Sequence, residues 1–214
     1  MQPWSREFNG RIDELEVESE VLRGNALGDP NVRPLWVYVP PGYDDDPERR
    51  FPCVYVIQGL TGQLDMWRNR EAFRPSYPEN IDALFGSGEA PPTLVAFVDC
   101  WTSIGGSQFL NSPATGRYQD FLCAEVVAFV DGRYRTIPDR DHRGIQGKSS
   151  GGYGALVTPM VRPDVFSAAE IEQMRAAFDR LEATARRLGG TAMHHGSQFV
   201  VDTTAHPDTG GFRI

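Results

Sequence analysis

The sequence predicts an α/β fold in which a mostly parallel sheet carries helices on both faces. Residues 53–57 and 93–98 are almost continuously apolar, as expected of strands that are buried on both faces. Between the run at 93–98 and the next predicted strand at 143–146, Leu122, Val126 and Val130 recur at the spacing of one helical stripe. Strands that alternate with helices are typical of a parallel sheet whose connections cover its two faces.

Shorter patterns predict the other elements. Apolar or small residues alternate with acidic ones from residue 15 to 21, which indicates a strand with one solvated face. A turn-rich loop over 24–34 precedes a second strand at 35–39, which ends at a Pro-Pro-Gly sequence. A long polar loop spans 100–117, a short strand 143–146, and a helix 153–160. The loops 58–62, 99–117 and 147–152 follow strands, and ligands in such sheets bind beyond the carboxyl ends of the strands.

Bulk composition limits the possible partners and compartments. The 214 residues are 40% apolar, which suits one domain with a core, and the net charge of −8 disfavours nucleic acid and anionic membranes as partners. No apolar stretch has membrane-spanning length, and the first ten residues have no secretory signal. The three cysteines are odd in number and widely spaced, so we expect buried free thiols and a cytoplasmic protein: Cys53, Cys100 and Cys123.

The motif that carries chemistry is Gly147-Lys148-Ser149-Ser150-Gly151. It matches G-x-S-x-G, the nucleophile elbow, in which a serine on a tight strand-to-helix turn projects its hydroxyl from the sheet. The turn also directs the first amides of the helix toward a developing oxyanion. A phosphate-binding P-loop would require glycine at position 142, where His142 stands, so Ser149 is predicted to be a catalytic nucleophile.

A serine nucleophile needs a histidine base and an acid that orients the base. His142 precedes Ser149 by seven residues on an extended strand, which places it about 20 Å away, at the wrong end of the sheet. Only 65 residues follow Ser149. The remaining candidates for the base and its orienting acid are therefore His194, His195 and His206 with Asp202 or Asp208.

Several stretches together resemble a known family. They are 37–43 (VYVPPGY), 56–59 (VIQG), 118–136, 147–156 (GKSSGGYGAL) and 162–166 (RPDVF). The region from about residue 12 to 167 resembles the putative esterase (esterase D) family of the α/β-hydrolase superfamily. That family includes S-formylglutathione hydrolases, enterochelin esterases, feruloyl esterases and the antigen 85 mycolyltransferases.

The resemblance implies a serine esterase or acyltransferase that acts on a small ester or thioester through an acyl-serine intermediate. It implies an oxyanion hole made by the amides of Leu60 and Ser150, and no cofactor or metal. Many members have His-Gly where this chain has Gln58-Gly59. The family's third loop lines the substrate cleft, so the candidate cleft residues here are Trp67, Trp101, Ser107 and Gln108, with core packing as the alternative for the tryptophans.

The carboxyl-terminal part departs from the family pattern. A capping box at 167–170 and apolar residues at steps of three and four predict an amphipathic helix over 168–188, followed by a short extended segment. This tail resembles the start of a phytanoyl-CoA dioxygenase-like domain. His206-Pro-Asp208 has the H-x-D form of some iron sites, and the alternative to a metal site there is a mobile tail.

These features divide the chain into a partial α/β-hydrolase domain, 1–167, and a non-family tail, 168–214. We expect the carboxyl-terminal part of the fold to be truncated or replaced. Two alternatives to an active esterase stay open: a catalytically incomplete relative that binds a ligand or partner, and a truncated or fused gene product. An incomplete sheet would expose an edge and favour self-association.

Overall fold

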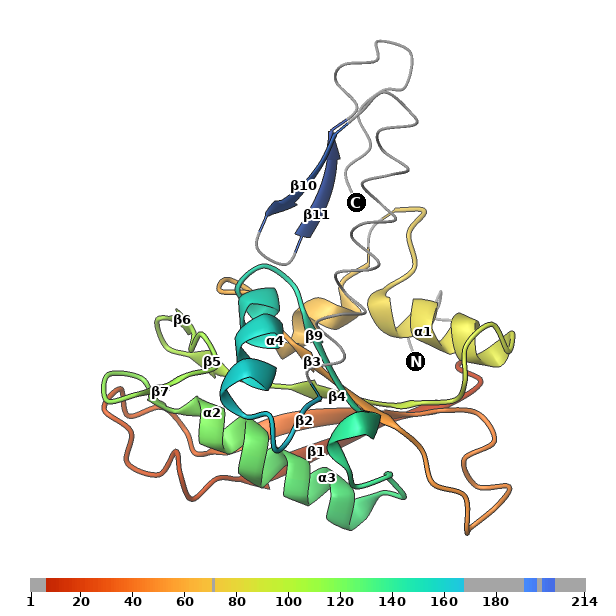
Figure 1. Cartoon of the computed structure of the whole chain (residues 1–214), viewed down its shortest axis with the longest axis horizontal. Coiled ribbons are helices and arrows are strands. Elements are labelled where there is room, and N and C mark those ends of the chain that lie inside the picture. The colour runs from red at the N-terminus through yellow and green to blue at the C-terminus, as the bar shows by residue number, and fades with distance from the viewer. Residues whose placement is uncertain (1–6, 71, 168–190, 196–197, 203–214) are drawn as a thin grey trace.

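The chain forms a five-stranded mixed sheet with helices on both faces (Figure 1). The computed structural model describes residues 7–70, 72–167, 191–195 and 198–202. The strand order is β1-β2-β4-β3-β9. The strands are β1 (Arg11–Glu18), β2 (Val32–Val39), β4 (Leu94–Val98), β3 (Cys53–Ile57) and β9 (Arg143–Gly147).

One strand of the sheet, β2, runs opposite to the other four. β4, β3 and β9 run parallel, whereas β2 is antiparallel to both β1 and β4. In the parallel part Ile57 lies opposite both Val98 and Gly147, so three strands end at the same level. The predicted α/β fold is confirmed, and the three loops that follow these strands meet at one edge of the sheet.

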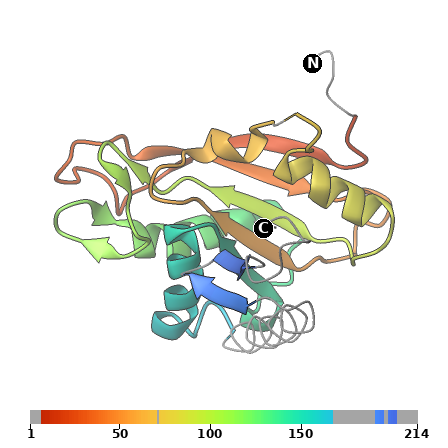
Figure 2. The ribbon, with the colours of Figure 1, turned by 90° about the horizontal axis from the view of Figure 1, so that it is seen from above.

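Each face of the sheet has its own apolar core, because alternate strand residues point to opposite faces. Figure 2 shows α1 (Tyr77–Gly86) and the 3-10 helix η1 (Leu64–Arg68) on one face, and the remaining helices on the other. Trp36 and Tyr38 of β2 belong to the first core, whereas Leu35, Val37 and Val39 belong to the second. β3 and β4 lie between both cores, which explains their continuous apolar sequences.

The second core is closed by two helical segments. One consists of α2 (Tyr118–Asp120), a π-helical stretch (Phe121–Val126) and α3 (Val127–Arg133), and its predicted apolar stripe is buried. The other is α4 (Ser150–Val161), longer at both ends than the predicted 153–160. Both pack against the face that also carries Tyr55 and Phe166, whose rings meet edge to face at 5.7 Å.

Helix α1 was not predicted from apolar periodicity. A capping box begins it: the Ser76 hydroxyl and amide both donate to Glu79 Oε2, at 2.8 and 2.7 Å. Asp82 then ties the helix to the sheet, since it accepts from Tyr38 Oη at 2.8 Å and from the Gly10 amide at 2.9 Å. A narrow apolar stripe completes the packing, since Ile81 is buried and Tyr77 and Phe85 pack beside it.

Two strand boundaries were also predicted wrongly. β1 begins four residues before the expected start at 15, because polar residues are tolerated on its solvated face. β2 begins at Val32, within the predicted loop, where Pro34 pairs with Glu16 of β1 but lies outside the register with β4.

The long loop after β4 contains two small hairpins. They are β5 (Trp101–Thr102) with β6 (Gly105–Gly106), and β7 (Asn111–Ser112) with β8 (Gly116–Arg117). Toward the carboxyl end, β10 (Thr191–His195) pairs with β11 (Gln198–Asp202) in an antiparallel register. The predicted helix at 168–188 lies outside the described residues. Within the described part of the chain, no helix has the length and apolarity that a membrane span requires.

Candidate active site

Ser149 occupies a strained turn between β9 and α4. Its backbone dihedral angles are φ 57° and ψ −119°, and it is the N-cap residue of α4. Residues with a side chain rarely adopt this region, and holding one there costs roughly 1–3 kcal/mol. The elbow geometry expected from G-x-S-x-G is thus observed, and the backbone strain falls on the serine itself.

The flanking glycines make this turn sterically feasible. A Cβ on Gly147 would lie 2.4 Å from the Gly151 carbonyl carbon, and a Cβ on Gly151 would lie 2.4 Å from the Ile57 carbonyl oxygen. Because these contacts are with backbone atoms, no side-chain rotation would relieve them. The two glycines therefore allow the elbow to pack directly against the end of β3.

The loop after β3 lies beside the serine side chain. A Cβ on Gly59 would be 3.3 Å from Ser149 Cβ, 3.9 Å from Ser149 Oγ and 3.2 Å from the Lys148 carbonyl oxygen. A larger residue at 59 would therefore crowd the hydroxyl. The next residue, Leu60, carries the first backbone amide after this close contact, and Leu60 is 46% exposed.

Two backbone amides are the predicted oxyanion donors, those of Ser150 and Leu60. Ser150 is the first residue of α4, and the first amides of a helix have no partner within the helix. In the turn after β3, the Gly62 amide donates to Gly59 O at 3.2 Å, a bond that does not use the intervening Leu60 amide. Acyl-transfer enzymes use oxyanion donors from two such segments, and the role of these two amides stays a prediction.

The β5–β6 hairpin is hydrogen-bonded to the turn that contains Leu60. The Gly106 amide donates to Leu60 O at 2.9 Å, and a Cβ on Gly105 would lie 2.9 Å from the same oxygen. Gly105 has φ 113°, a value that favours glycine. Glycine at 105 and 106 therefore lets the hairpin approach the turn closely enough for a backbone hydrogen bond.

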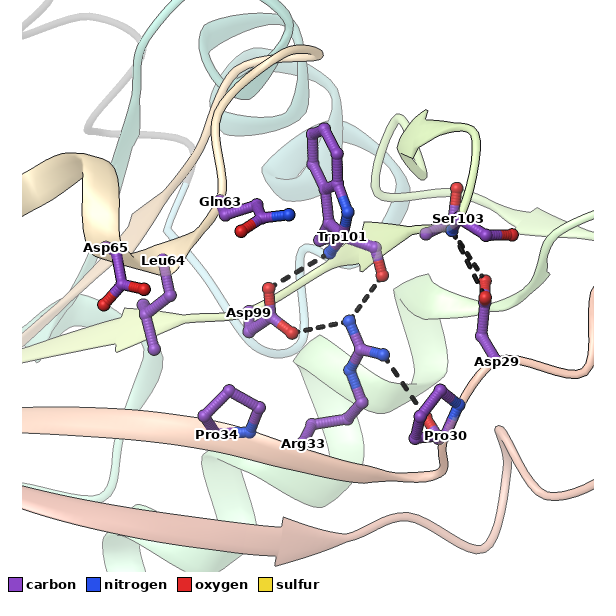
Figure 3. A pocket seen from close by; sticks show the side chains of 11 residues that line it. Asp29, Pro30, Arg33, Pro34, Gln63, Leu64, Asp65, Asp99, Trp101 and Ser103 are labelled. Carbon is purple, nitrogen blue, oxygen red and sulfur yellow. Dashed lines mark hydrogen bonds and ion pairs between the residues drawn. The ribbon is translucent and has the colours of Figure 1, made fainter.

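A cleft of about 330 Å³ opens beside Trp101, and its lining includes neither Ser149 nor Leu60 (Figure 3). Arg33 and Asp99 form a buried ion pair that lines it, with side chains 7% and 8% exposed. Burial raises the pKa of Asp99, and the Arg33 guanidinium opposes that shift. The cleft walls combine Leu64, Pro30 and Pro34 with Gln63 and Asp65.

The predicted cleft residues take different positions. Trp101 is partly buried and lines the 330 Å³ cleft, which Ser149 does not line, so its role in a substrate wall stays a prediction. Trp67 is 7% exposed and its ring lies 6.1 Å from that of Phe97 in the sheet core, which matches the core-packing alternative. Gln108 is half-buried at φ 60°, whereas Ser107 is buried and its hydroxyl accepts from the Phe109 amide at 3.3 Å.

No histidine with a described side chain lies at the serine. His142 is at the amino end of β9, opposite to the elbow, and its Nδ1 lies 2.7 Å from Asp139 Oδ1. The side-chain hydrogen bond to His142 lowers the pKa of Asp139. His194 and His195 fall on β10, whose side chains are not described, and His206, Asp202 and Asp208 likewise carry no described side chain. Among the described residues there is no cluster of three side chains able to hold a metal ion.

Sequence reasoning missed two features of this edge. The Arg33–Asp99 pair joins residues 66 positions apart, and no local pattern links them. The side chain of Gln58 is fully buried, and the replacement of the family's His-Gly by Gln58-Gly59 did not predict this. The signals that could have indicated them are positional: Asp99 directly follows the buried strand β4, and Gln58 directly follows the buried strand β3.

The fold and the elbow together define an α/β-hydrolase-type protein. A model of the family described as "Putative esterase" matches residues 29–172, two thirds of the chain, and the chain belongs to this family.

Solved structures with the same fold include a ferulic acid esterase, with a TM-score of 0.60 and 25% sequence identity over 75% of this chain and 57% of that one. An S-formylglutathione hydrolase from Agrobacterium tumefaciens gives 0.56 and 19% over 76% and 57%. An uncharacterised protein of Corynebacterium glutamicum is 22% identical over 138 residues, which are 64% of this chain and 32% of that protein. The chain therefore spans about a third of this curated relative and just over half of these solved chains.

Proposed function

We propose that this chain is a serine carboxylic-ester hydrolase or acyltransferase in which Ser149 is the nucleophile. The observation that carries the proposal is the strained backbone of Ser149, at φ 57° and ψ −119°, on a strand-to-helix turn. Such strain persists only where the surroundings enforce it, and it clusters at active sites. Membership of the esterase family supports hydrolysis of a carboxylic ester as the reaction class.

In the proposed reaction, Ser149 Oγ attacks the ester carbonyl carbon while a base removes the hydroxyl proton. The carbonyl oxygen becomes an oxyanion that accepts hydrogen bonds from the amides of Leu60 and Ser150. The intermediate collapses, the alcohol leaves with the proton from the base, and an acyl-serine remains. Attack by water, or by an acceptor alcohol, then releases the acyl group and regenerates the serine.

The base and its orienting acid are proposed to come from residues without described side chains. His194, His195 and His206 are the candidates for the base, with Asp202 or Asp208 as the acid. A second candidate function is favoured by His142, which lies at the end of β9 opposite to Ser149. In that alternative the chain is a catalytically incomplete relative that binds a small ester or thioester, or a partner, without turnover.

Hydrolysis of p-nitrophenyl acetate separates these functions. We expect turnover above the buffer rate that is lost in Ser149→Ala. The matched control is Ser87→Ala, which removes an exposed hydroxyl at the far end of α1. Equal rates for the chain, Ser149→Ala and buffer would leave only the non-catalytic function.

A further inference from the structure

The side chain of Gln58 joins the ends of two neighbouring strands. It is fully buried directly after β3. One orientation of its carboxamide satisfies every group around it. In that orientation, Nε2 donates to Val98 O, and Oε1 accepts from the amides of Cys100 and Trp101, all at 2.9 Å. A single side chain therefore binds Val98, the last residue of β4, and two residues of the following loop, Cys100 and Trp101.

Other side chains hold the same backbone segment. The Trp101 carbonyl oxygen accepts from Arg33 Nη2 and from Tyr118 Oη, the latter at 3.2 Å. The Trp101 amide also lies 3.3 Å from Asp99 Oδ1, which belongs to the buried ion pair. Both the amide and the carbonyl oxygen of Trp101 are thus held by side chains, and Gln58, directly after β3, supplies one of these contacts.

The fixed segment passes its position to the Leu60 turn. Trp101 pairs with Gly106 in the β5–β6 hairpin, and the Ser107 amide donates to Cys100 O at 3.1 Å. Gly106 in turn donates to Leu60 O at 2.9 Å and would bring a Cβ within 3.3 Å of Leu60 Cα. Gln58 is therefore connected to Leu60 by two routes, through the adjoining backbone and through the hairpin.

We propose that Gln58 is a positioning residue that aligns the Leu60 amide with the oxyanion. Its buried carboxamide fixes the loop after β4, and the hairpin of that loop holds the Leu60 turn in place. This inference rests on the proposed esterase function. Gln58 itself touches neither the nucleophile nor the substrate, and its effect is exerted through hydrogen bonds to Val98, Cys100 and Trp101.

The alternative is that Gln58 contributes only to stability, because unsatisfied buried groups destabilise any fold. Gln58→Leu keeps a similar volume but removes all three hydrogen bonds. Gln58→Glu retains the oxygen that accepts from Cys100 and Trp101, and in its protonated form also the donor to Val98. Val126→Ala truncates a fully buried side chain in the π-helical stretch, away from the elbow, and serves as the destabilised control.

The first measurement is the single-turnover acylation of each variant by p-nitrophenyl acetate, which separates substrate binding from the acylation rate constant. We expect Gln58→Leu to lower the rate constant by about 10- to 100-fold, with the substrate dissociation constant within about twofold, as for a misaligned oxyanion donor. Gln58→Glu should recover most of this loss, and Val126→Ala should keep the rate constant. Acylation of Gln58→Leu at the wild-type rate would overturn the proposal, as would an equal loss in Val126→Ala.

Hydrogen exchange distinguishes failure of this inference from failure of the esterase assignment. If the unmodified chain is not acylated, the proposed function fails, and the backbone amides still report on Gln58. We expect amides of residues 59–62 and 99–106 to exchange at least about tenfold faster in Gln58→Leu, while β3 stays protected. Unchanged exchange in both segments would show that Gln58 does not position the Leu60 turn.

Discussion

Replacing Ser149 by glycine should stabilise the protein relative to replacing it by alanine. Both variants lack the hydroxyl, so they differ only in how well the residue tolerates φ 57° and ψ −119°. Alanine keeps a strain of roughly 1–3 kcal/mol, which glycine avoids. Glycine costs about 0.4–1 kcal/mol through the greater entropy of the unfolded chain. The net expectation is that Ser149→Gly is more stable than Ser149→Ala by about 0.5–2 kcal/mol.

The assay is urea unfolding of both variants, with melting temperatures as a second measure. For a domain of this size, 1 kcal/mol corresponds to a shift of about 2–4 °C. The neighbouring Ser150 provides the control pair, because it is the first residue of α4 and there alanine should be the more stable by about 0.5–1 kcal/mol. If the order at position 149 matched that at position 150, Ser149 would not be strained and the elbow argument would fail.

Further predictions concern glycine packing, thiol ionisation and assembly. Gly151→Ala should lower the free energy of unfolding in urea by at least about 3 kcal/mol, because its Cβ would lie 2.4 Å from Ile57 O. Gly132→Ala in α3, with open space around it, should raise the free energy of unfolding by about 0.5–1 kcal/mol. Equal effects of the two substitutions would contradict this packing. Burial raises the thiol pKa of Cys53 and Cys123 to about 12 from an ordinary 9.0. The contribution of these buried thiols to the free energy of unfolding is therefore full below pH 9 and is lost as pH rises toward 12. Accordingly, a thiol reagent at pH 8 should label the folded chain negligibly and the urea-unfolded chain at three sites, and rapid labelling of the folded chain would disprove this burial. Among the described residues β9 pairs only with β3, and we propose that the chain self-associates, so sedimentation should show a mass that rises with concentration, and a constant monomer mass would refute this.

Sequence alone was sufficient where one local pattern determined the structure. The apolar runs of β3 and β4 require burial on both faces, and the spacing of Gly147, Ser149 and Gly151 requires a sharp turn. Both signals depend on neighbours within a few residues, so they survive without knowledge of the rest of the fold. This is why the α/β class and the elbow were predicted correctly.

Features that depend on distant residues were not predictable in this way. The direction of β2 is set by its pairing with β4, and its own sequence fits either direction. Helix α1 depends on a capping box and on Asp82 binding Tyr38, in addition to a narrow apolar stripe that packs on the sheet. At the site, the contribution of Gln58 arises only because β3 and β4 end side by side, which places its carboxamide against the β4 loop.

Trp67 illustrates a different limit. Tryptophan near a cleft loop is compatible with a substrate wall and with core packing, and the choice depends on which way η1 faces. In the structure η1 packs on the sheet, with Trp67 against Tyr77 at 5.2 Å and Phe97 at 6.1 Å. Trp101, on the loop after β4, lines the cleft beside Arg33 and Asp99, and its role in a substrate wall stays a prediction.

The most direct test of the account is the reaction of the folded chain with a fluorophosphonate, followed by peptide mapping. A serine whose hydroxyl is exposed on the elbow, beside the amides of Leu60 and Ser150, should form one phosphonyl adduct at Ser149. Ser149→Ala and the urea-unfolded chain should form none. An adduct distributed over several serines, or its absence from Ser149 in the folded chain, would contradict the assignment of Ser149 as a nucleophile.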